Sequence, residues 1–319
     1  MSVKVFTSDL EPLLATFETR LRELVHSDVE FIRLIEDDLV TAGGKRVRPQ
    51  LAFLASRALG GVPHEMELAL AVELLHSTAL LHDDLVDDAE TRRGHVAAFR
   101  KYGNAVSVLA GDYLLSRLLY LLSKTGRMEL VYMFSEVARE LAEGEVLQFQ
   151  IAALGDYSLE VYERIITGKT ASLMRLACEG AAVLGQAPGE WRRALASFGL
   201  LYGQAFQMRD DYLDLMGTPE SLGKPIGGDV REGKLTAITL GLLEVYPQET
   251  LEIIHRRGAQ PGDIETLRKL ARASGVAEEV VRAIGGRVDQ AIAALLVLPP
   301  SPSRDALEAL AKREISRLT

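Results

Sequence analysis

Two acidic motifs with the same internal spacing are the strongest chemical feature of the sequence. They are Asp83, Asp84 and Asp87 in LLHDDLVDDAE, and Asp210, Asp211 and Asp214 in MRDDYLDLMG. Aspartates four residues apart share one face of a helix, where like charges repel and partial burial among leucines raises the cost. A single motif of this kind is more often a solvated acidic face, but two copies in apolar helices favour a binding site. Because Mg²⁺ binds through carboxylates and phosphate oxygens, we predict two helices that face a shared cavity and hold a polyanion through metal ions.

Such a polyanion, a diphosphate for example, also needs fixed positive charge. TAGGKRVRP supplies Lys45, Arg46 and Arg48 after two glycines, although a basic loop is more often a solvated turn. ETRRGHV supplies Arg92 and Arg93, which would also suit the negative C-terminal end of a helix.

Further polar candidates lie in apolar or glycine-rich surroundings. A lone histidine in a helix is more often a satisfied core residue, and the glutamine one turn before the second acidic motif could simply pack. The stretch GKPIGGDVREGKLT is either an exposed connection or a lid that closes over a metal site. The candidates are His76, Lys169, Thr170, Gln207, Lys224 and Lys234.

The elements that must position these residues have helical periodicity. Apolar residues repeat at helical spacing over residues 66–82, 114–122, 129–151, 159–184 and 192–216. Several of these stretches are apolar on nearly all sides, which is typical of helices buried centrally in a bundle. There is no linker, repeat or low-complexity run, so we expect one all-helical domain over residues 1–319, with two domains that meet near residue 155 as the alternative.

Composition excludes several classes of function. The 319 residues carry a net charge of −9, which speaks against nucleic-acid binding and is compatible with bound cations. The one cysteine, Cys178, allows no internal disulfide and no cysteine-type metal site. The N-terminal stretch has charges where a signal peptide needs an apolar run, and no uncharged run is long enough to span a membrane. We expect a cytoplasmic protein with at most peripheral membrane contact.

The motifs GGKRVRP, LLHSTALLHDDLVDD, RRG, GKTA, FQMRDDYLD and GKPIGGDVREGK, in this order, resemble the all-trans isoprenyl (polyprenyl) diphosphate synthase family. The resemblance spans residues 43–236 and implies the isoprenoid synthase fold, a single large all-α bundle around a deep central cavity, usually as a homodimer. It also implies a reaction. An allylic prenyl diphosphate ionises, and the resulting carbocation alkylates isopentenyl diphosphate and releases pyrophosphate.

By motif position, the resemblance assigns a role to each candidate. Arg92, Lys169 and Lys234 would bind the allylic diphosphate, and Lys224 would assist the leaving group. Thr170 and Gln207 would present oxygen dipoles to the carbocation. The released pyrophosphate would take the final proton, since no neutral base is evident. Isopentenyl diphosphate would be held by Lys45, Arg48, His76 and Arg93, and Mg²⁺ by Asp83, Asp84, Asp87, Asp210 and Asp214. One departure from the family pattern, Thr236-Ala237-Ile238 in place of Thr-Leu-Pro, affects a helix start and no ligand.

The product length implied by the resemblance depends on the residues just before the first acidic motif. Aromatic side chains four and five residues before the first aspartate stop elongation early in this family, whereas this chain has Ala79 and Thr78. We therefore expect a long-chain product of the kind attached to respiratory quinones, with farnesyl or geranylgeranyl diphosphate synthesis as the alternative. More remote alternatives are a terpene cyclase, which would have no use for Lys45, Arg48 and Arg93, and a non-catalytic partner subunit.

Overall fold

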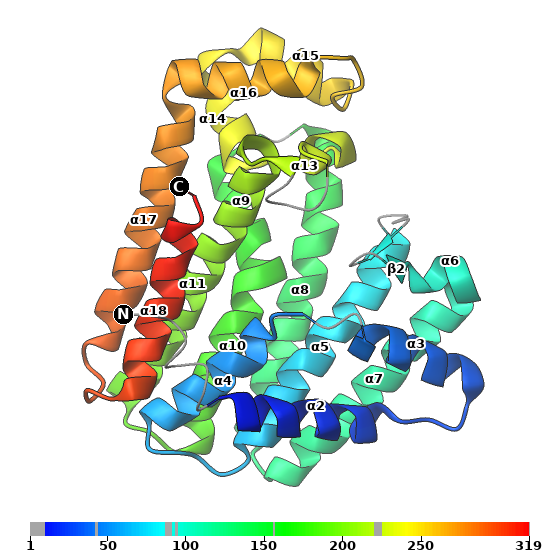
Figure 1. Ribbon diagram of the computed structural model, residues 1–319, viewed down its shortest axis with the longest axis vertical. Coiled ribbons are helices and arrows are strands. Elements are labelled where there is room, and N and C mark those ends of the chain that lie inside the picture. Colours follow the sequence, from blue (N-terminus) through cyan, green and yellow to red (C-terminus); the bar gives the residue numbers. More distant parts are fainter. Residues whose placement is uncertain are drawn as a thin grey trace. The chain divides into compact units, whose positions relative to one another are not determined.

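Helices make up most of the parts of the chain that the structure describes. The computed structural model covers residues 10–41, 44–86, 91–92, 95–155, 157–219 and 225–318, with side chains except those of 36–41, 91–92, 95 and 152–154. Within these ranges the strands are limited to one short antiparallel pair, β1 (Thr91–Arg92) and β2 (His95–Val96). The predicted all-α fold is confirmed (Figure 1).

The predicted helical stretches correspond to observed helices. They lie in α5 (Glu65–Val86), α7 (Asn104–Thr125), α8 (Met128–Leu154) and α11 (Gly189–Met216). The pattern over residues 159–184 is the exception, because it is divided into α9 (Leu159–Ile166), a π-helical turn η1 (Thr167–Ala171) and α10 (Ser172–Leu184). A π-helical turn changes the hydrogen-bond register without changing the apolar periodicity, so the sequence pattern does not reveal it.

Contacts divide the chain into two compact units, each built from three stretches. Unit 1 comprises Met1–Arg139, Leu173–Gly199 and Leu295–Leu307, and unit 2 comprises Glu140–Ser172, Leu200–Ala294 and Glu308–Thr319. Because the stretches alternate along the chain, two consecutive domains that meet near residue 155 do not describe them. One domain over residues 1–319 stays a prediction.

Unit 1 is organised around α5. This helix packs most extensively on α7 and next on α4 (Val47–Ala58), with α2 (Glu11–Val25), α3 (Glu30–Thr41) and α6 (Ala98–Tyr102) around them (Figure 1). Close contact of α5 and α7 depends on Gly111, where an added Cβ would lie 2.3 Å from Nε2 of His82. Phe17 and Phe53 meet edge to face in the core, with ring centroids 6.3 Å apart.

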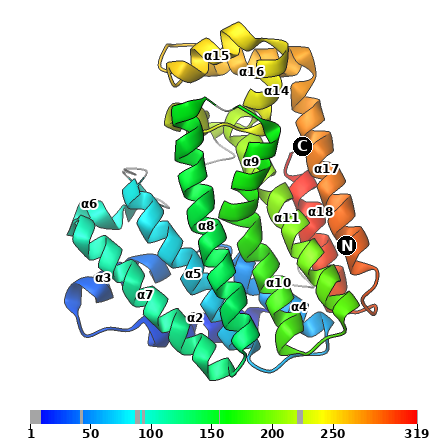
Figure 2. The ribbon, with the colours of Figure 1, turned by 180° about the vertical axis from the view of Figure 1, so that it is seen from behind.

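Unit 2 holds the second acidic motif and the C-terminal helices. Two helices, α15 (Pro247–His255) and α16 (Asp263–Ser274), cross its upper end, and α17 (Val276–Leu295) descends from α16 (Figure 2). They follow α13 (Gly228–Glu232) and α14 (Ala237–Val245), and α18 (Pro302–Ser316) ends the chain. Thr236 caps α14 in a reciprocal capping box with Thr239, so the departure from the family pattern at Thr236-Ala237-Ile238 does lie at a helix start.

One described helix, α7, is long and apolar enough to cross a membrane by length and composition. The core helix of a soluble protein can have the same length and apolar composition. The charged residues Asp112 and Arg117 interrupt the apolar sequence of this helix, and its main packing partner is α5.

Candidate active site

The second acidic motif occupies the C-terminal part of α11 and presents its three carboxylates differently. The side chain of Asp210 is 47% exposed, whereas Asp211 and Asp214 are buried. Asp214 is tied to the following turn, since Oδ2 accepts from the backbone N–H of Asp229 at 2.9 Å and its carbonyl accepts from Gly227 at 2.7 Å. The motif is therefore a fixed element of unit 2 and not a solvated acidic face.

The turn beyond Asp214 is more regular than a loop. Residues 228–232 of the glycine-rich stretch form the short helix α13, bracketed by Gly227 (φ 78°) and Gly233 (φ 76°), both in the left-handed conformation that glycine adopts most easily. The sequence-based interpretation of this stretch as an exposed connection or a lid therefore lacked the helix α13. Lys234 follows directly, and its Nζ lies 2.6 Å from a carboxylate oxygen of Glu232.

Arg209 supports the motif from the buried side. Its guanidinium, 2% exposed, donates to Oδ1 of Asp210 and pairs with Glu314 of α18. Tyr202 donates to the same glutamate at 3.2 Å, and Phe206 lies under the guanidinium at 4.4 Å. Both bonds to Asp210 use Oδ1, so among the described residues Oδ2 stays available for a cation.

A continuous hydrogen-bond chain joins the motif to the predicted Thr170 and Gln207. The hydroxyl of Thr170 donates to Oε1 of Gln207 at 2.7 Å, and Nε2 of Gln207 donates to Oδ1 of Asp211 at 2.7 Å. Oδ2 of Asp211 accepts from the hydroxyl of Tyr162 at 2.6 Å. The structure thus brings these two predicted residues together with Asp211 and adds Tyr162, which the sequence did not single out.

Burial raises the pKa of the Asp211 carboxyl to about 6. The hydrogen bonds from Tyr162 and Gln207 oppose this shift, and the negative charges of Asp210 and Asp214 add to it. Burial likewise holds the pKa of Tyr162 well above its usual value, so its hydroxyl stays protonated and donates.

Lys169 and Thr170 lie in the π-helical turn η1. Such turns are rare and are frequent at functional sites. The turn fits because glycines let neighbouring backbones come close: an added Cβ on Gly168 would lie 2.6 Å from the carbonyl oxygen of Glu140, and one on Gly203 would lie 2.5 Å from Cα of Ala171. The sequence indicated Lys169 and Thr170 but not the π-helical turn in which they lie.

The ammonium group of Lys169 is held by α8. It pairs with Glu145 and donates to Oε1 of Gln148 at 3.0 Å. Only 21% of the side chain is exposed, so the charge has a defined position. An anion that bound to Lys169 would replace Glu145 and Gln148 as partners of the ammonium group.

The first acidic motif begins at the C-terminal end of α5 in unit 1. Asp84 is 4% exposed, whereas Asp83 and His76 are half-buried on the same helix. Ser107 of α7 donates to the carbonyl of Leu81 at 3.3 Å, which fixes this part of α5. The helix ends at Val86, and Asp87 lies outside the described residues.

The basic motif after the glycines divides between surface and core. Lys45 is exposed and Arg48 is half-buried, but Arg46 is 8% exposed. Arg46 has a left-handed backbone (φ 46°) and turns inward to bind Glu18 and Glu73, each at 2.6 Å. Arg46 is therefore a structural cation, which corrects its grouping with Lys45 and Arg48.

Comparison with known proteins decides the family. The polyprenyl synthetase family matches residues 29–271. The chain belongs to this family. Members of the polyprenyl synthetase family are prenyltransferases, and the resemblance and the enzyme class predicted from the motifs are confirmed.

Individual members of the polyprenyl synthetase family match over most of the chain. The octaprenyl diphosphate synthase of Escherichia coli (strain K12) is 36% identical over 310 residues, which cover 95% of each chain. A short chain isoprenyl diphosphate synthase of Methanothermobacter thermautotrophicus is 38% identical over 234 residues, 71% of this chain and 72% of the relative. The structure of a polyprenyl synthase from Caulobacter crescentus CB15, complexed with calcium and isoprenyl diphosphate, superposes with a TM-score of 0.91 at 37% identity and covers 100% of this chain and 98% of its own.

Four predicted site residues fall wholly or partly outside the part of the chain that the structure describes. Asp87, Arg93 and Lys224 lie outside the described residues, as does the side chain of Arg92. Among the residues that are described, no three histidine, cysteine or carboxylate side chains converge on one metal position. A Mg²⁺ site does not require such a cluster, because Mg²⁺ is commonly held by one or two carboxylates plus substrate oxygens.

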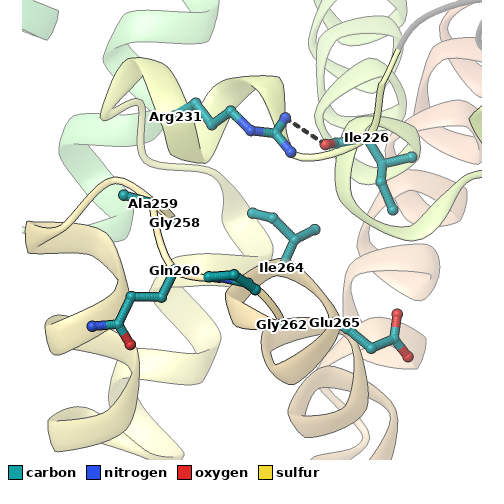
Figure 3. Close-up of a pocket in the computed structure, with 9 residues that line it drawn as sticks. Ile226, Arg231, Gly258, Ala259, Gln260, Gly262, Ile264 and Glu265 are labelled. Carbon is teal, nitrogen blue, oxygen red and sulfur yellow. Dashed lines mark hydrogen bonds between the residues drawn. The ribbon is translucent and has the colours of Figure 1, made fainter.

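A separate pocket of about 460 Å³ lies in unit 2 (Figure 3). It adjoins the turn at Gly227, which donates to Asp214, and is lined by none of the predicted site residues. Arg231 donates to the carbonyl of Ile226 at 2.7 Å across one side of it. The pocket is lined by Ile226, Arg231, Gly258, Ala259, Gln260, Pro261, Gly262, Ile264 and Glu265.

Proposed function

We propose that the protein is a long-chain all-trans polyprenyl diphosphate synthase. It would condense isopentenyl diphosphate repeatedly, head to tail, onto an allylic prenyl diphosphate and release pyrophosphate at each step. The observation that carries this proposal is the joining of Thr170 and Gln207 to the second acidic motif within one unit, in a chain that belongs to the polyprenyl synthetase family. Oxygen acceptors beside a metal-type motif suit a reaction that creates a carbocation and a diphosphate leaving group.

Mg²⁺ is the cofactor that the carboxylates fit. The donor set is all oxygen, as Mg²⁺ prefers, and Asp210 combines an exposed side chain with an oxygen that is not used by Arg209. Asp83, Asp84, Asp87, Asp210 and Asp214 would hold the ions. Bound Mg²⁺ would neutralise negative charge on the diphosphate as it departs.

The chain's own residues would divide the remaining work. Lys169 and Lys234 would bind the allylic diphosphate, together with Arg92, and Lys224 would assist its departure. Oγ1 of Thr170 and Oε1 of Gln207 would turn lone pairs toward the developing positive charge, which stabilises the transition state more than the ground state. Isopentenyl diphosphate would be held by Lys45, Arg48, His76 and Arg93, and the released pyrophosphate would take the proton.

Long products are supported by the residues one turn before Asp83. Thr78 is buried, and its hydroxyl faces the carbonyl oxygen of Gly111 at 3.4 Å, so this position is occupied by packing of α5 on α7. Ala79 is half-buried and has only a methyl group to limit a growing chain. The octaprenyl synthase relative, matched over 95% of its length, favours the same reading.

A product assay tests the proposal. Purified protein is incubated with Mg²⁺, isopentenyl diphosphate and farnesyl diphosphate, and the products are separated by length. We expect products longer than geranylgeranyl diphosphate and no turnover after chelation of the metal. Products that end at farnesyl or geranylgeranyl would favour the short-chain alternative, which the Methanothermobacter relative keeps open. Turnover of a prenyl diphosphate without isopentenyl diphosphate would indicate a cyclase.

Ala79→Tyr tests the position of the length limit. A phenol ring one turn below Asp83 should shorten the product while Mg²⁺ dependence is kept. Thr78→Val is the matched control, because it removes a hydroxyl but adds no length. Unchanged product lengths in Ala79→Tyr would place the limit elsewhere.

Composition and surface support a proposal for the oligomeric state and the location of the enzyme. A homodimer is supported by apolar side chains exposed on α7 and the start of α8, among them Leu109 (63%) and Tyr132 (66%). A cytoplasmic location is supported by the single, buried and unpaired Cys178. Contact with a membrane would be peripheral and would serve release of the apolar product.

A further inference from the structure

The hydrogen bonds that link Thr170 and Gln207 to Asp211 and Tyr162 have a fixed donor-to-acceptor order. Tyr162 and Gln207 both donate to Asp211, one to each carboxylate oxygen, at 2.6 and 2.7 Å. The hydroxyl of Thr170 donates to Gln207 at 2.7 Å. Tyr162 is 3% exposed and Asp211 and Thr170 are 7% exposed, so water has little opportunity to replace these bonds.

The direction follows from the chemistry of the groups. An ionised carboxylate only accepts hydrogen bonds, so the side-chain amide of Gln207 must turn its N–H toward Asp211. Its oxygen then faces Thr170, whose hydroxyl proton is directed to that oxygen. As a result, the lone pairs of the Thr170 hydroxyl and the second lone pair of the Gln207 oxygen are left for another partner.

We propose that Tyr162 is a positioning residue for prenyl transfer. By donating to one oxygen of Asp211, its hydroxyl holds the carboxylate so that the other oxygen accepts from Gln207. This fixes the amide with its oxygen, and not its N–H, toward the reacting carbon. The inference rests on the proposed function, because it assigns Tyr162 a role in stabilising the carbocation through Gln207.

The position of Tyr162 suits this role. Ser158 caps α9 by accepting from the backbone N–H of Val161 at 3.3 Å, and one helical turn later Tyr162 is buried against α11. The next residue, Glu163, pairs with Arg287 of α17. The tyrosine is thus held from both sides along the chain, and its hydroxyl reaches Asp211, which lies 49 residues away in sequence.

Tyr162→Phe tests the proposal because it removes the hydroxyl and keeps the ring. With an allylic diphosphate and isopentenyl diphosphate, we expect kcat to fall about tenfold while KM for both substrates stays within about twofold, as for loss of an interaction made only in the transition state. Thr250→Val is the matched control. It removes another buried hydroxyl of unit 2, which donates to the carbonyl of Leu242 at 3.4 Å, and should leave kcat unchanged.

A double-mutant cycle separates positioning from a general loss of stability. In a Gln207→Met background there is no amide to orient, so adding Tyr162→Phe should lower kcat no further. A full, multiplicative effect in that background would overturn the proposal. If Tyr162→Phe does not fold, Asp211→Asn takes its place in the cycle, since an amide at residue 211 no longer dictates the orientation of Gln207.

The wild-type reaction distinguishes a failure of the proposed function from a failure of the proposed role of Tyr162. Absence of prenyl transfer by the wild-type protein with Mg²⁺ would overturn the proposed function and this inference together. Normal transfer combined with an unchanged kcat in Tyr162→Phe would overturn the inference alone.

Discussion

At the scale of single residues, the burial of Asp211 beside the proposed catalytic residues Thr170 and Gln207 has a cost in stability. Burial raises its pKa from 3.8 to about 6, so between these values the folded protein keeps a proton that the unfolded chain has released. In metal-free protein, the contribution of Asp211 to the free energy of unfolding therefore falls as the pH rises through this window, by at most about 3 kcal/mol, and is constant above it.

Asp211→Asn should remove this pH dependence. In the presence of a chelator, we expect the variant to have a higher free energy of unfolding than the wild type at about pH 8, with the difference closing toward about pH 4. Urea unfolding across this range measures it. Parallel curves for the two proteins would show that Asp211 ionises without cost.

Arg46 provides a second residue-scale prediction, this time of stability alone. Arg46→Ala would leave Glu73, whose side chain is 5% exposed, as an unpaired buried charge. We expect a loss of about 3–5 kcal/mol in the free energy of unfolding. Arg57→Ala is the control, because Arg57 is 47% exposed and its pair with Glu65 contributes less than about 1 kcal/mol. Similar losses in the two variants would contradict the structural role of Arg46.

At the scale of elements, the π-helical turn depends on a close approach by α11. Gly203→Ala would bring a Cβ to 2.5 Å from Cα of Ala171, next to Thr170. We expect a loss of about 1–3 kcal/mol in stability, from overpacking, together with a lower kcat. Gly286→Ala in the exposed face of α17, where a Cβ meets nothing within 4 Å, should stabilise by about 0.5–1 kcal/mol without affecting kcat. Unchanged kcat in Gly203→Ala would mean that Thr170 does not depend on this packing.

The elements also show what sequence could and could not predict. Apolar periodicity predicted α5, α7, α8 and α11 because burial imposes it along the whole helix. Thr170 and Gln207 were singled out by the family resemblance of GKTA and FQMRDDYLD, and the structure places their side chains in hydrogen-bond contact. The π-helical turn was missed since it is a change of backbone register. Tyr162 and Glu314 were missed because they bond to residues far away in the sequence. Tyr162 bonds to Asp211, 49 residues away, and Glu314 to Tyr202, 112 residues away, so no local pattern reveals them.

At the scale of the whole molecule, exposed apolar side chains bear on the proposed homodimer. The exposed apolar side chains of α7 and the start of α8 form a surface that a monomer would leave in water, with Leu109 at 63%, Leu119 at 54% and Met128 at 77% exposure. Exposed apolar patches of this kind mark protein–protein contacts more often than chance would give. A second copy of the chain is the partner that the homodimer proposal requires.

Charge on this surface should therefore separate the copies. We expect the double variant Leu109→Glu and Leu119→Glu to elute at the monomer mass by light scattering where the wild type elutes as a dimer, because a buried, unpaired carboxylate costs several kcal/mol at each position of an interface. Leu296→Glu, at a 70% exposed leucine of unit 1 outside α7 and α8, is the control and should stay dimeric. Activity per chain measured on the monomer would then show whether one copy suffices for prenyl transfer. A double variant that remains dimeric would place the interface on another face.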